Sequence, residues 1–260
     1  MLKSFVKNAL RYKPLSETEG VRGAIDAAGV DGLPYCPPYE GDLLFSLIRK
    51  NGCRRCLETG FHTGSTALYM AAAVADRDGQ VVSICVDDDE SVQRGLELLR
   101  TTGHADRHRL IRENSNRALP ELFLAGERFD FIFMDGWKTF DHLAFEMYYF
   151  NQILDRGGVI AFDDSYMPSV RKAITLLKRY YGYEEVNYRN HNQTGRLRLL
   201  HYFTQRSLHR PYRALIKMLA TEDQIAIRDW HFYRRISALT LRLSIHGDAI
   251  CRPCFFTVRN

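Results

Sequence analysis

Two stretches of this chain, Phe129-Asp-Phe-Ile-Phe-Met-Asp-Gly-Trp-Lys138 and Gly157-Gly-Val-Ile-Ala-Phe-Asp-Asp164, decide its fold class. Each stretch is an apolar, strand-like run that ends abruptly in aspartate. Charge is unfavourable inside a buried strand, so the acids are expected at the rim of a sheet. In open α/β sheets, the rim at the carboxyl ends of the strands is where ligands bind. The two stretches therefore predict a buried parallel sheet with a ligand site at one edge.

Three carboxylates, Asp135, Asp163 and Asp164, reach this rim from two strands, and Lys138 follows three residues after the first of them. Oxygen ligands of this kind suit hard cations such as Mg²⁺ or Ca²⁺. Asp is also a common helix-capping residue, so Asp163 and Asp164 have an alternative role as a cap and a turn. The pattern favours a divalent-metal site and leaves the capping interpretation open.

Around these stretches, strand-like and helix-like periods alternate along the chain. Strands are predicted at 55–58, 80–86, 108–111, 129–134 and 158–162, and helices at 40–50, 65–75, 91–101, 117–125, 140–154 and 168–181. Short apolar strands separated by helices indicate βαβ units and a parallel sheet. Two further strands, 183–188 and 196–204, are joined by a polar turn and predict an antiparallel hairpin at the sheet edge.

The first strand leads into a glycine loop, Leu57-Glu-Thr-Gly-Phe-His-Thr-Gly-Ser-Thr66. Gly60 and Gly64 let the backbone turn tightly and approach a ligand closely. Their spacing is not the GxGxxG of dinucleotide binders, so the signal depends on its context, a strand before and a helix after. The next strand ends in the acids 87–90, of which Asp87 is the candidate to accept hydrogen bonds from ribose hydroxyls. A helix-capping run at 87–90 is compatible with this role, because only one acid needs to face the ligand.

These motifs together resemble the class I S-adenosylmethionine (SAM)-dependent methyltransferases, and within them the metal-dependent O-methyltransferases of the catechol and macrolide-sugar types. Four blocks carry the resemblance, namely residues 57–66, 114–122, 129–138 and 155–164, and with their spacing they cover roughly residues 35–205. The implied fold is Rossmann-like: an α/β, doubly wound, mostly parallel seven-stranded sheet with a C-terminal antiparallel hairpin, followed by a C-terminal extension.

The resemblance also implies roles for individual residues. The methionine end of SAM would contact Glu58, Gly60, His62, Gly64 and Thr66, the ribose Asp87, and the adenine Ser115, Asn116 and Trp137. Mg²⁺ would be bound by Asp135, Asp163 and Asp164, with Asp135 also on the cofactor side. Lys138 stands where the family carries a basic residue.

The chain departs from the family pattern at three places. His62 stands where an aromatic residue is common, and many relatives have Asp-Asn where this chain has Asp163-Asp164. The second strand ends in several acids rather than one. The last 55 residues match no known pattern.

Methyl transfer to oxygen is an in-line displacement that needs an activated hydroxyl. Mg²⁺ would lower the pKa of that hydroxyl and orient it. Lys138 would then take the proton, which requires that the nearby cation lowers the pKa of the lysine. The alternative for Lys138 is a surface lysine that opens a helix. The predicted function is methylation of a small hydroxylated molecule, with a metal-independent methyltransferase as the main alternative.

The bulk composition limits the remaining possibilities. Residues 188–260 hold 13 Lys+Arg and 4 Asp+Glu, a charge of +9, which leaves −4 for the other residues out of a total of +5. This basic tail keeps an RNA methyltransferase or a nucleic-acid-binding protein as a disfavoured alternative, because its cations are dispersed and no RNA-binding signature is present. No run of 18 apolar residues predicts a membrane span. The start lacks the apolar run of a secretory signal, so a cytoplasmic location is expected.

Three segments are predicted along the chain: residues 1–34 as a helical segment and substrate cap, 35–205 as the methyltransferase domain, and 206–260 as a basic, partly helical extension. The extension is the expected contact of a homodimer. Two CxxC pairs, Cys53/Cys56 and Cys251/Cys254, lie too far apart for a known zinc motif and are interpreted as reduced thiols. His142 and the other scattered histidines lack metal-ligand spacing.

Overall fold

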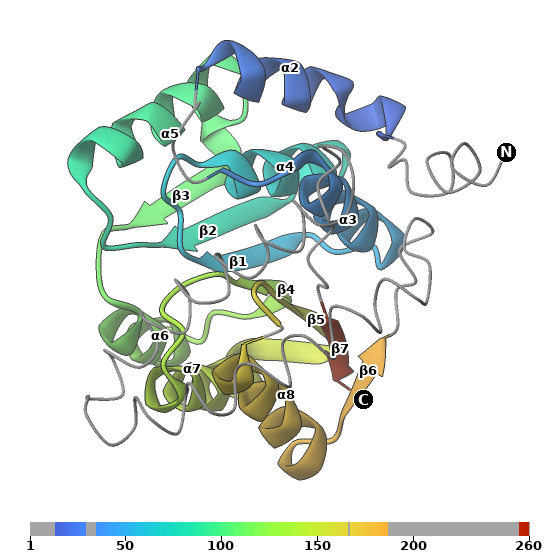
Figure 1. Cartoon of the computed structure of the whole chain (residues 1–260), viewed down its shortest axis with the longest axis vertical. Helices are drawn as coiled ribbons and strands as arrows, with labels where there is room; N and C mark the ends of the chain where they lie inside the picture. Colours follow the sequence, from blue (N-terminus) through green and yellow to red (C-terminus); the bar gives the residue numbers. More distant parts are fainter. Residues whose placement is uncertain (1–13, 30–34, 166, 187–254, 260) are drawn as a thin grey trace, which may run out of the picture.

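A seven-stranded sheet forms the centre of the computed structural model, which describes residues 14–29, 35–165, 167–186 and 255–259 (Figure 1). The strand order is β3-β2-β1-β4-β5-β7-β6. The five strands from β3 to β5 are parallel, and β7 is antiparallel to both of its neighbours. The prediction of a mostly parallel α/β sheet is thereby confirmed.

The strands are β1 (Arg55–Thr59), β2 (Gln80–Ile84), β3 (His108–Ile111), β4 (Phe129–Met134), β5 (Leu154–Phe162), β6 (Tyr183–Val186) and β7 (Phe255–Arg259). The helices are α2 (Glu19–Ala27), α3 (Pro38–Lys50), α4 (Ser65–Val74), α5 (Asp89–Thr101), α6 (Ser115–Leu124), α7 (Phe140–Ile153) and α8 (Pro168–Tyr180). Short 3₁₀ turns lie at Ser16–Thr18, Ala75–Arg77 and Ala105–Arg107.

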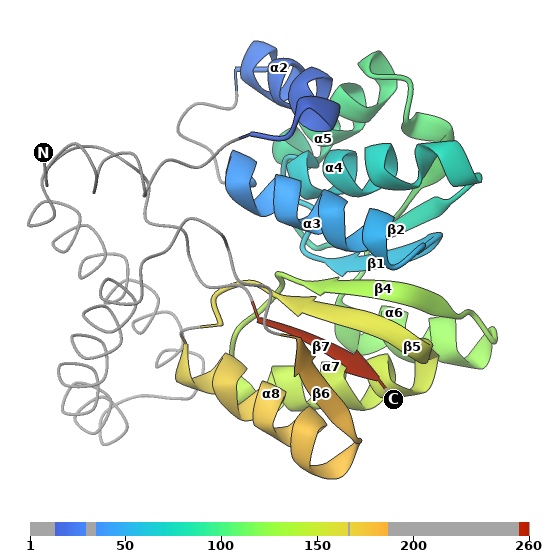
Figure 2. The same cartoon turned by 90° about the vertical axis from the view of Figure 1, so that its right-hand side faces the viewer.

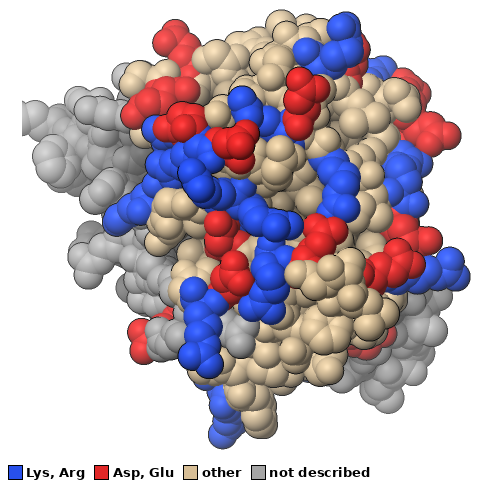
Figure 3. Space-filling model, turned by 180° about the vertical axis from the view of Figure 1, so that it is seen from behind, with Lys and Arg blue, Asp and Glu red and all other residues tan. Residues whose placement is uncertain are grey.

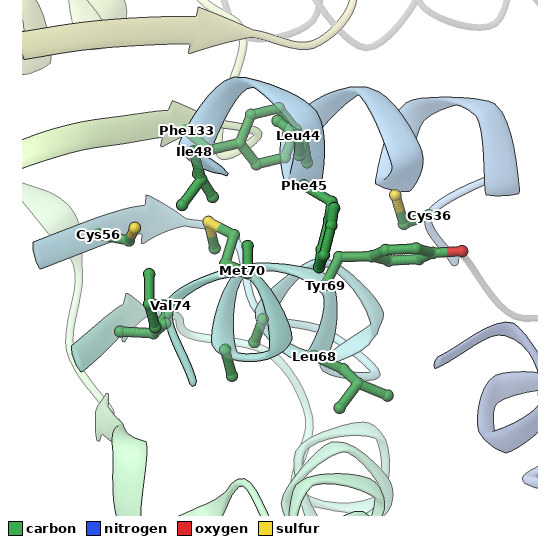
Figure 4. Packing of buried hydrophobic residues seen from close by; sticks show 14 of the residues in the cluster. Cys36, Leu44, Phe45, Ile48, Cys56, Leu68, Tyr69, Met70, Val74 and Phe133 are labelled. Carbon is green, nitrogen blue, oxygen red and sulfur yellow. The ribbon is translucent and has the colours of Figure 1, made fainter. Parts of the chain in front are cut away.

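Helices cover both faces of the sheet. Figure 2 shows α2, α3, α4 and α5 on one side of the strands and α6, α7 and α8 on the other. Alternate residues of each strand enter opposite cores, as the two-residue period of a strand requires. Cys56 and Phe131 pack with the first group of helices, whereas Leu57 and Ile132 pack with the second. Figure 4 shows the first core, where Cys56 and Phe133 lie against side chains of α3 and α4.

Of the hairpin predicted at the sheet edge, the structure describes only the first strand. β6 begins at Tyr183 as expected, but the strand beside it is β7, from the end of the chain. β7 lies between β5 and β6 and pairs with both, for example Phe162 with Phe255. The predicted second strand of the hairpin, residues 196–204, lies outside the described residues, so its pairing stays a prediction. The pairing of β6 with β7 could not be predicted, because a strand pattern indicates where a strand runs but not which strand it joins. The segment predicted as an extension thus contributes one strand to the sheet.

Several other expectations lie outside the described residues. They are the first 13 residues of the predicted helical segment 1–34, the strand 196–204, the helical part of the extension 206–260, and the thiols of Cys251 and Cys254. The described thiols Cys53 and Cys56 are both buried.

The strand order reverses beside β1. From β1 the chain proceeds outward to β3 and then returns to β4 on the other side of β1. A reversal of this kind leaves a crevice at the carboxyl ends of the two central strands, where ligands of open α/β sheets bind. The register pairs Thr59 with Met134, so Gly60 and Asp135 follow the two strands side by side.

Candidate active site

The loops after β1 and β4 touch each other at Gly60. The backbone of Gly60 has φ +98°, and a Cβ there would lie 2.7 Å from the carbonyl oxygen of Asp135. Gly64, with φ +70°, begins α4, and a Cβ there would lie 2.9 Å from the Cα of Gly95. Both positions combine a left-handed conformation with a close approach, which only glycine tolerates. The GxxxG spacing in the sequence therefore reflects two steric requirements at the crevice.

The glycine loop is also tied to the acid after β2. His62 has a positive φ of 45°, and its backbone N–H donates to Oδ2 of Asp87 over 2.8 Å. Asp88, and not Asp87, caps α5 by accepting from the backbone N–H of Ser91. The acids that end β2 thus divide between the two roles considered from the sequence, and Asp87 is the one that faces the loop.

Glu58 is a fully buried carboxyl group near the end of β1. Its Oε1 accepts a 2.6 Å hydrogen bond from the hydroxyl of Ser83, which lies 2.7 Å from Nε2 of His108. Burial raises the pKa of Glu58 to about 8, the hydroxyls of Ser83 and Thr66 oppose this shift, and the charge of Asp135 adds to it. Glu58 therefore holds its proton at neutral pH until a cation approaches.

The residues predicted to surround an adenine lie at the start of α6 and after β4. Ser115 is buried as the first residue of α6, and the backbone N–H of Asn116 donates to Oδ1 of the capping Asn114 over 2.9 Å. Trp137 is 46% exposed. Ser115 also contacts His142, with 3.0 Å between Oγ and Nε2. His142 is a residue of this site that was not predicted, because its only signal in the sequence is the i,i+4 spacing to Glu146 on α7.

The rim acids surround Lys138. Its Nζ donates to Oδ1 of Asp135 over 2.9 Å, while Asp163 and Asp164 are buried at the end of β5. Burial alone would lower the pKa of Lys138, but the charges of the three carboxylates raise it above its ordinary value. The pKa of Lys138 is raised because the lysine itself is the counter-charge of the acids, and its lowering by a bound cation stays a prediction. In this state Lys138 is an ammonium at neutral pH.

The three carboxylates do not form a complete metal cage. Within the described part of the chain, no three His, Cys, Asp or Glu side chains are grouped so as to hold a metal ion. The donor chemistry nevertheless fits a hard cation, since three carboxylates act electrostatically on one point at the sheet edge. The ammonium of Lys138 supplies the positive charge there.

The segment before α3 borders the same rim. Cys36 is buried, and its backbone N–H donates to the hydroxyl of Ser65 over 2.8 Å. Burial raises the pKa of the Cys36 thiol, and the charges of Glu40, Asp135 and Asp163 raise it further. The thiol is therefore not an activated nucleophile, and its segment forms a wall beside the acids.

Surface charges on the far side of the molecule are mixed. Figure 3 shows Lys and Arg side chains interspersed with Asp and Glu on the face opposite to that of Figure 1. Ion pairs of described residues include Arg109 with Glu127 at 2.7 Å and Arg128 with Asp155 at 3.0 Å. Among the described residues of that face, no continuous basic stripe favours a phosphate backbone. No helix within the described ranges is long and apolar enough to cross a bilayer.

Comparison with known proteins adds to this geometry. Residues 57–165 match a family described as a methyltransferase domain. Tricin synthase 2 of Oryza sativa subsp. japonica is 30% identical over 169 residues, 63% of this chain and 56% of that protein. Caffeoyl-CoA O-methyltransferase of Populus kitakamiensis is 30% identical over 133 residues, 50% of this chain and 54% of that protein. The chain thus spans little more than half of the length of these curated relatives.

The fold is shared with solved O-methyltransferases. One from Bacillus cereus, in complex with S-adenosylhomocysteine (SAH), superposes with a TM-score of 0.55 at 18% identity over 71% of this chain and 88% of that one. Residues 57–165 thus match a methyltransferase domain, and the described fold is that of solved O-methyltransferases. One of the two curated relatives is an O-methyltransferase by name, as is the solved structure from Bacillus cereus, and these matches confirm the resemblance to O-methyltransferases found in the sequence.

Proposed function

We propose that this protein transfers the methyl group of SAM to a hydroxyl oxygen of a small molecule. The observation that carries the proposal is the contact between the Gly60 loop and the backbone of Asp135 at the switch point of the sheet. Because of this contact, the glycine loop lies at the same crevice as the buried lysine, Lys138, and the three rim carboxylates. Relatives named tricin synthase and caffeoyl-CoA O-methyltransferase support an acceptor that carries a hydroxyl group.

The cofactor would lie along the carboxyl ends of β1, β2 and β4. Glu58 would take the ammonium of the methionine portion, with Gly60, His62, Gly64 and Thr66 around it. Asp87 would accept hydrogen bonds from the ribose hydroxyls, and it is held toward the loop by the N–H of His62. Ser115, Asn116 and Trp137 would surround the adenine, since they lie beside the end of β4 or at the start of α6.

The acceptor hydroxyl would lie next to Lys138. Its Nζ is buried beside Asp135, so a hydroxyl placed there would exchange hydrogen bonds with both groups rather than with water. Proximity of the oxygen to the methyl carbon would itself lower the barrier by about 7–11 kcal/mol. The segment around Cys36 and Glu40 would form one wall of the acceptor pocket.

A divalent metal is part of this proposal. Asp135, Asp163 and Asp164 would hold Mg²⁺, which when bound supplies a Lewis acid that acidifies and orients the acceptor hydroxyl. A second positive charge among the three acids would lower the pKa of Lys138, and this change is what allows Nζ to accept the hydroxyl proton.

A metal-independent transferase is the second candidate. The observation that favours it is the ion pair of Lys138 with Asp135, because the lysine already supplies a positive charge beside the three acids. In that case the acids would hold Lys138 in place and serve the cofactor side of the crevice.

The experiment that tests the proposal is calorimetric titration of SAM and SAH, with Mg²⁺ and after EDTA, in the presence and absence of catechols and hydroxylated sugars. Micromolar SAH binding together with metal-dependent acceptor binding would support the Mg²⁺-dependent transferase. Acceptor binding unaffected by EDTA would support the metal-independent one. Absence of SAH and SAM binding would refute both.

A further inference from the structure

A buried polar cluster of Ser115, His142 and Glu146 lies between α6 and α7. Nε2 of His142 is 3.0 Å from Oγ of Ser115 and 3.2 Å from Oε1 of Glu146. Glu146 is fully buried, and its second oxygen, Oε2, has no hydrogen-bond partner among the described residues. A buried carboxyl group without full hydrogen bonding is costly to folding, so its presence calls for a function.

This cluster lies directly under the crevice. A Cβ at Gly136 would be 3.2 Å from Oγ1 of Thr59 and 3.7 Å from Oε1 of Glu146. Gly136 stands between Asp135 and Trp137, and Oγ1 of Thr59 is a second buried oxygen that lacks a hydrogen-bond partner within the described part of the chain. The polar atoms therefore form the floor beneath the backbone that carries two of the predicted site residues.

The geometry decides which atom carries the proton of His142. Ser115 and Glu146 both approach the same nitrogen, Nε2, so the arrangement is not a Ser-His-acid triad, in which the acid binds the other nitrogen. A carboxylate accepts hydrogen bonds and cannot donate one. In the tautomer that satisfies an ionised Glu146, Nε2 carries the hydrogen and shares it with the hydroxyl oxygen of Ser115.

This hydrogen on Nε2 determines the direction in which the Ser115 hydroxyl can donate. Because its oxygen accepts from Nε2–H, its own O–H cannot point at His142 and has to donate elsewhere. We infer that Glu146 and His142 are positioning residues that present the Ser115 hydroxyl as a donor to an unprotonated ring nitrogen of the cofactor's purine, and thereby select adenine. The N1 atom of adenine is such an acceptor, whereas N1 of hypoxanthine carries a hydrogen. This inference rests on the proposed function, since it needs the adenine to lie beside Ser115.

The test compares the affinity for SAH with that for its deaminated analogue, S-inosylhomocysteine, by calorimetry. The full-length wild-type protein should prefer SAH by about tenfold or more, the cost of leaving one buried donor unmatched. Ser115→Ala should lose most of this preference. Glu146→Gln should reduce it as well, because a neutral amide no longer requires a hydrogen on Nε2, so the Ser115 hydroxyl can donate to that nitrogen instead.

His142→Phe is a second variant that removes the donor without placing a new charge in the core. The matched control is Glu121→Gln, the same chemical change on the exposed side of α6, which should keep the wild-type ratio. A wild-type ratio in Glu146→Gln and His142→Phe, both folded by thermal melting, would overturn the inference while SAH binding upholds the proposed function. No binding of SAH to the wild type would overturn both.

Discussion

Nζ of Lys138 lies 2.9 Å from Oδ1 of Asp135, three residues earlier in the chain, and the two groups close the carboxyl end of β4 with a largely buried ion pair. The lysine side chain is 10% exposed and that of Asp135 is 37% exposed, so only the acid side is open to solvent. Because Asp163 and Asp164 also raise the pKa of this lysine, any proton transfer to Nζ requires their charge to be compensated first.

Replacement of Lys138 by Ala should reduce turnover by about 10²-fold or more, the usual contribution of a general base. The affinity for SAH should stay within about twofold, because no cofactor group is expected at Nζ. Single-turnover methyl transfer and calorimetry on the same preparation measure the two effects. Lys172→Ala, an exposed lysine of α8, is the control and should leave both values unchanged. Near-normal turnover in Lys138→Ala would remove the lysine from the mechanism.

Binding of SAH should depend on pH through Glu58. Its pKa is about 8 in the free protein, so below pH 8 the approach of the ligand's ammonium expels the proton. The affinity for SAH should therefore rise as the pH increases from 6 to 8. Over the same range, the number of protons released per SAH bound should fall, because fewer Glu58 side chains are still protonated before binding. Titrations in buffers of different ionisation enthalpy measure that release. Glu58→Gln should bind more weakly and release no proton at this site, and an unchanged proton release would exclude Glu58 as the ammonium partner.

The same group should lower stability in alkaline solution. The pKa of Glu58 is raised on folding from 4.5 to about 8, so its contribution to stability is largest below pH 4.5 and is lost as the pH rises through 8. The loss is on the order of a few kcal/mol. Relative to the wild type, Glu58→Gln should be more stable at pH 9 than at pH 6, as read from denaturant unfolding at both values. A difference that is independent of pH would mean that the carboxyl group is already ionised at pH 6.

Gly60→Ala should both destabilise the fold and weaken SAH binding. The new Cβ would meet the carbonyl oxygen of Asp135 at 2.7 Å and adopt a positive φ. Gly126→Ala is the matched control, because Gly126 has φ +71° but nothing within 4 Å of its Cβ position. The control should lose only about 1–2 kcal/mol for the left-handed backbone. Gly60→Ala should lose clearly more, and equal losses in urea unfolding would contradict the close contact between the two loops.

Removal of a rim acid should remove the response to metal. Asp163→Ala should abolish most activity and the effect of EDTA on what remains, since a hard cation needs its carboxylate oxygens. Asp164→Asn should keep metal-dependent turnover, because an amide oxygen is still a ligand for such cations. Mg²⁺ titrations of the methyl-transfer rate distinguish these cases. If EDTA affects Asp163→Ala as it affects the wild type, the rim acids are not the metal ligands.

Local sequence patterns predicted most of the parallel part of the fold. β4 runs over Phe129–Met134 as expected, and α5 and α7 differ from prediction by only one or two residues at one end. β5 begins earlier than expected, at Leu154, because Leu154 pairs with Phe129 across a register shift in the neighbouring strand. These elements could be read from the sequence because the two-residue and 3.6-residue periods are local properties of the chain.

Only those parts of the site that directly follow a strand could be predicted from the sequence. Parallel strands bring their carboxyl ends to one edge, so the meeting of Gly60 with Asp135 followed from the pattern of loops and acids. The pairing of β6 with Phe255–Arg259 and the contact of Ser115 with His142, 27 residues away, did not follow from it. The sequence by itself determined which residues reach the rim, because strand and helix periods are encoded locally. Only the tertiary structure decided their partners, protonation and hydrogen-bond directions, because these depend on distances and burial between segments far apart in the chain.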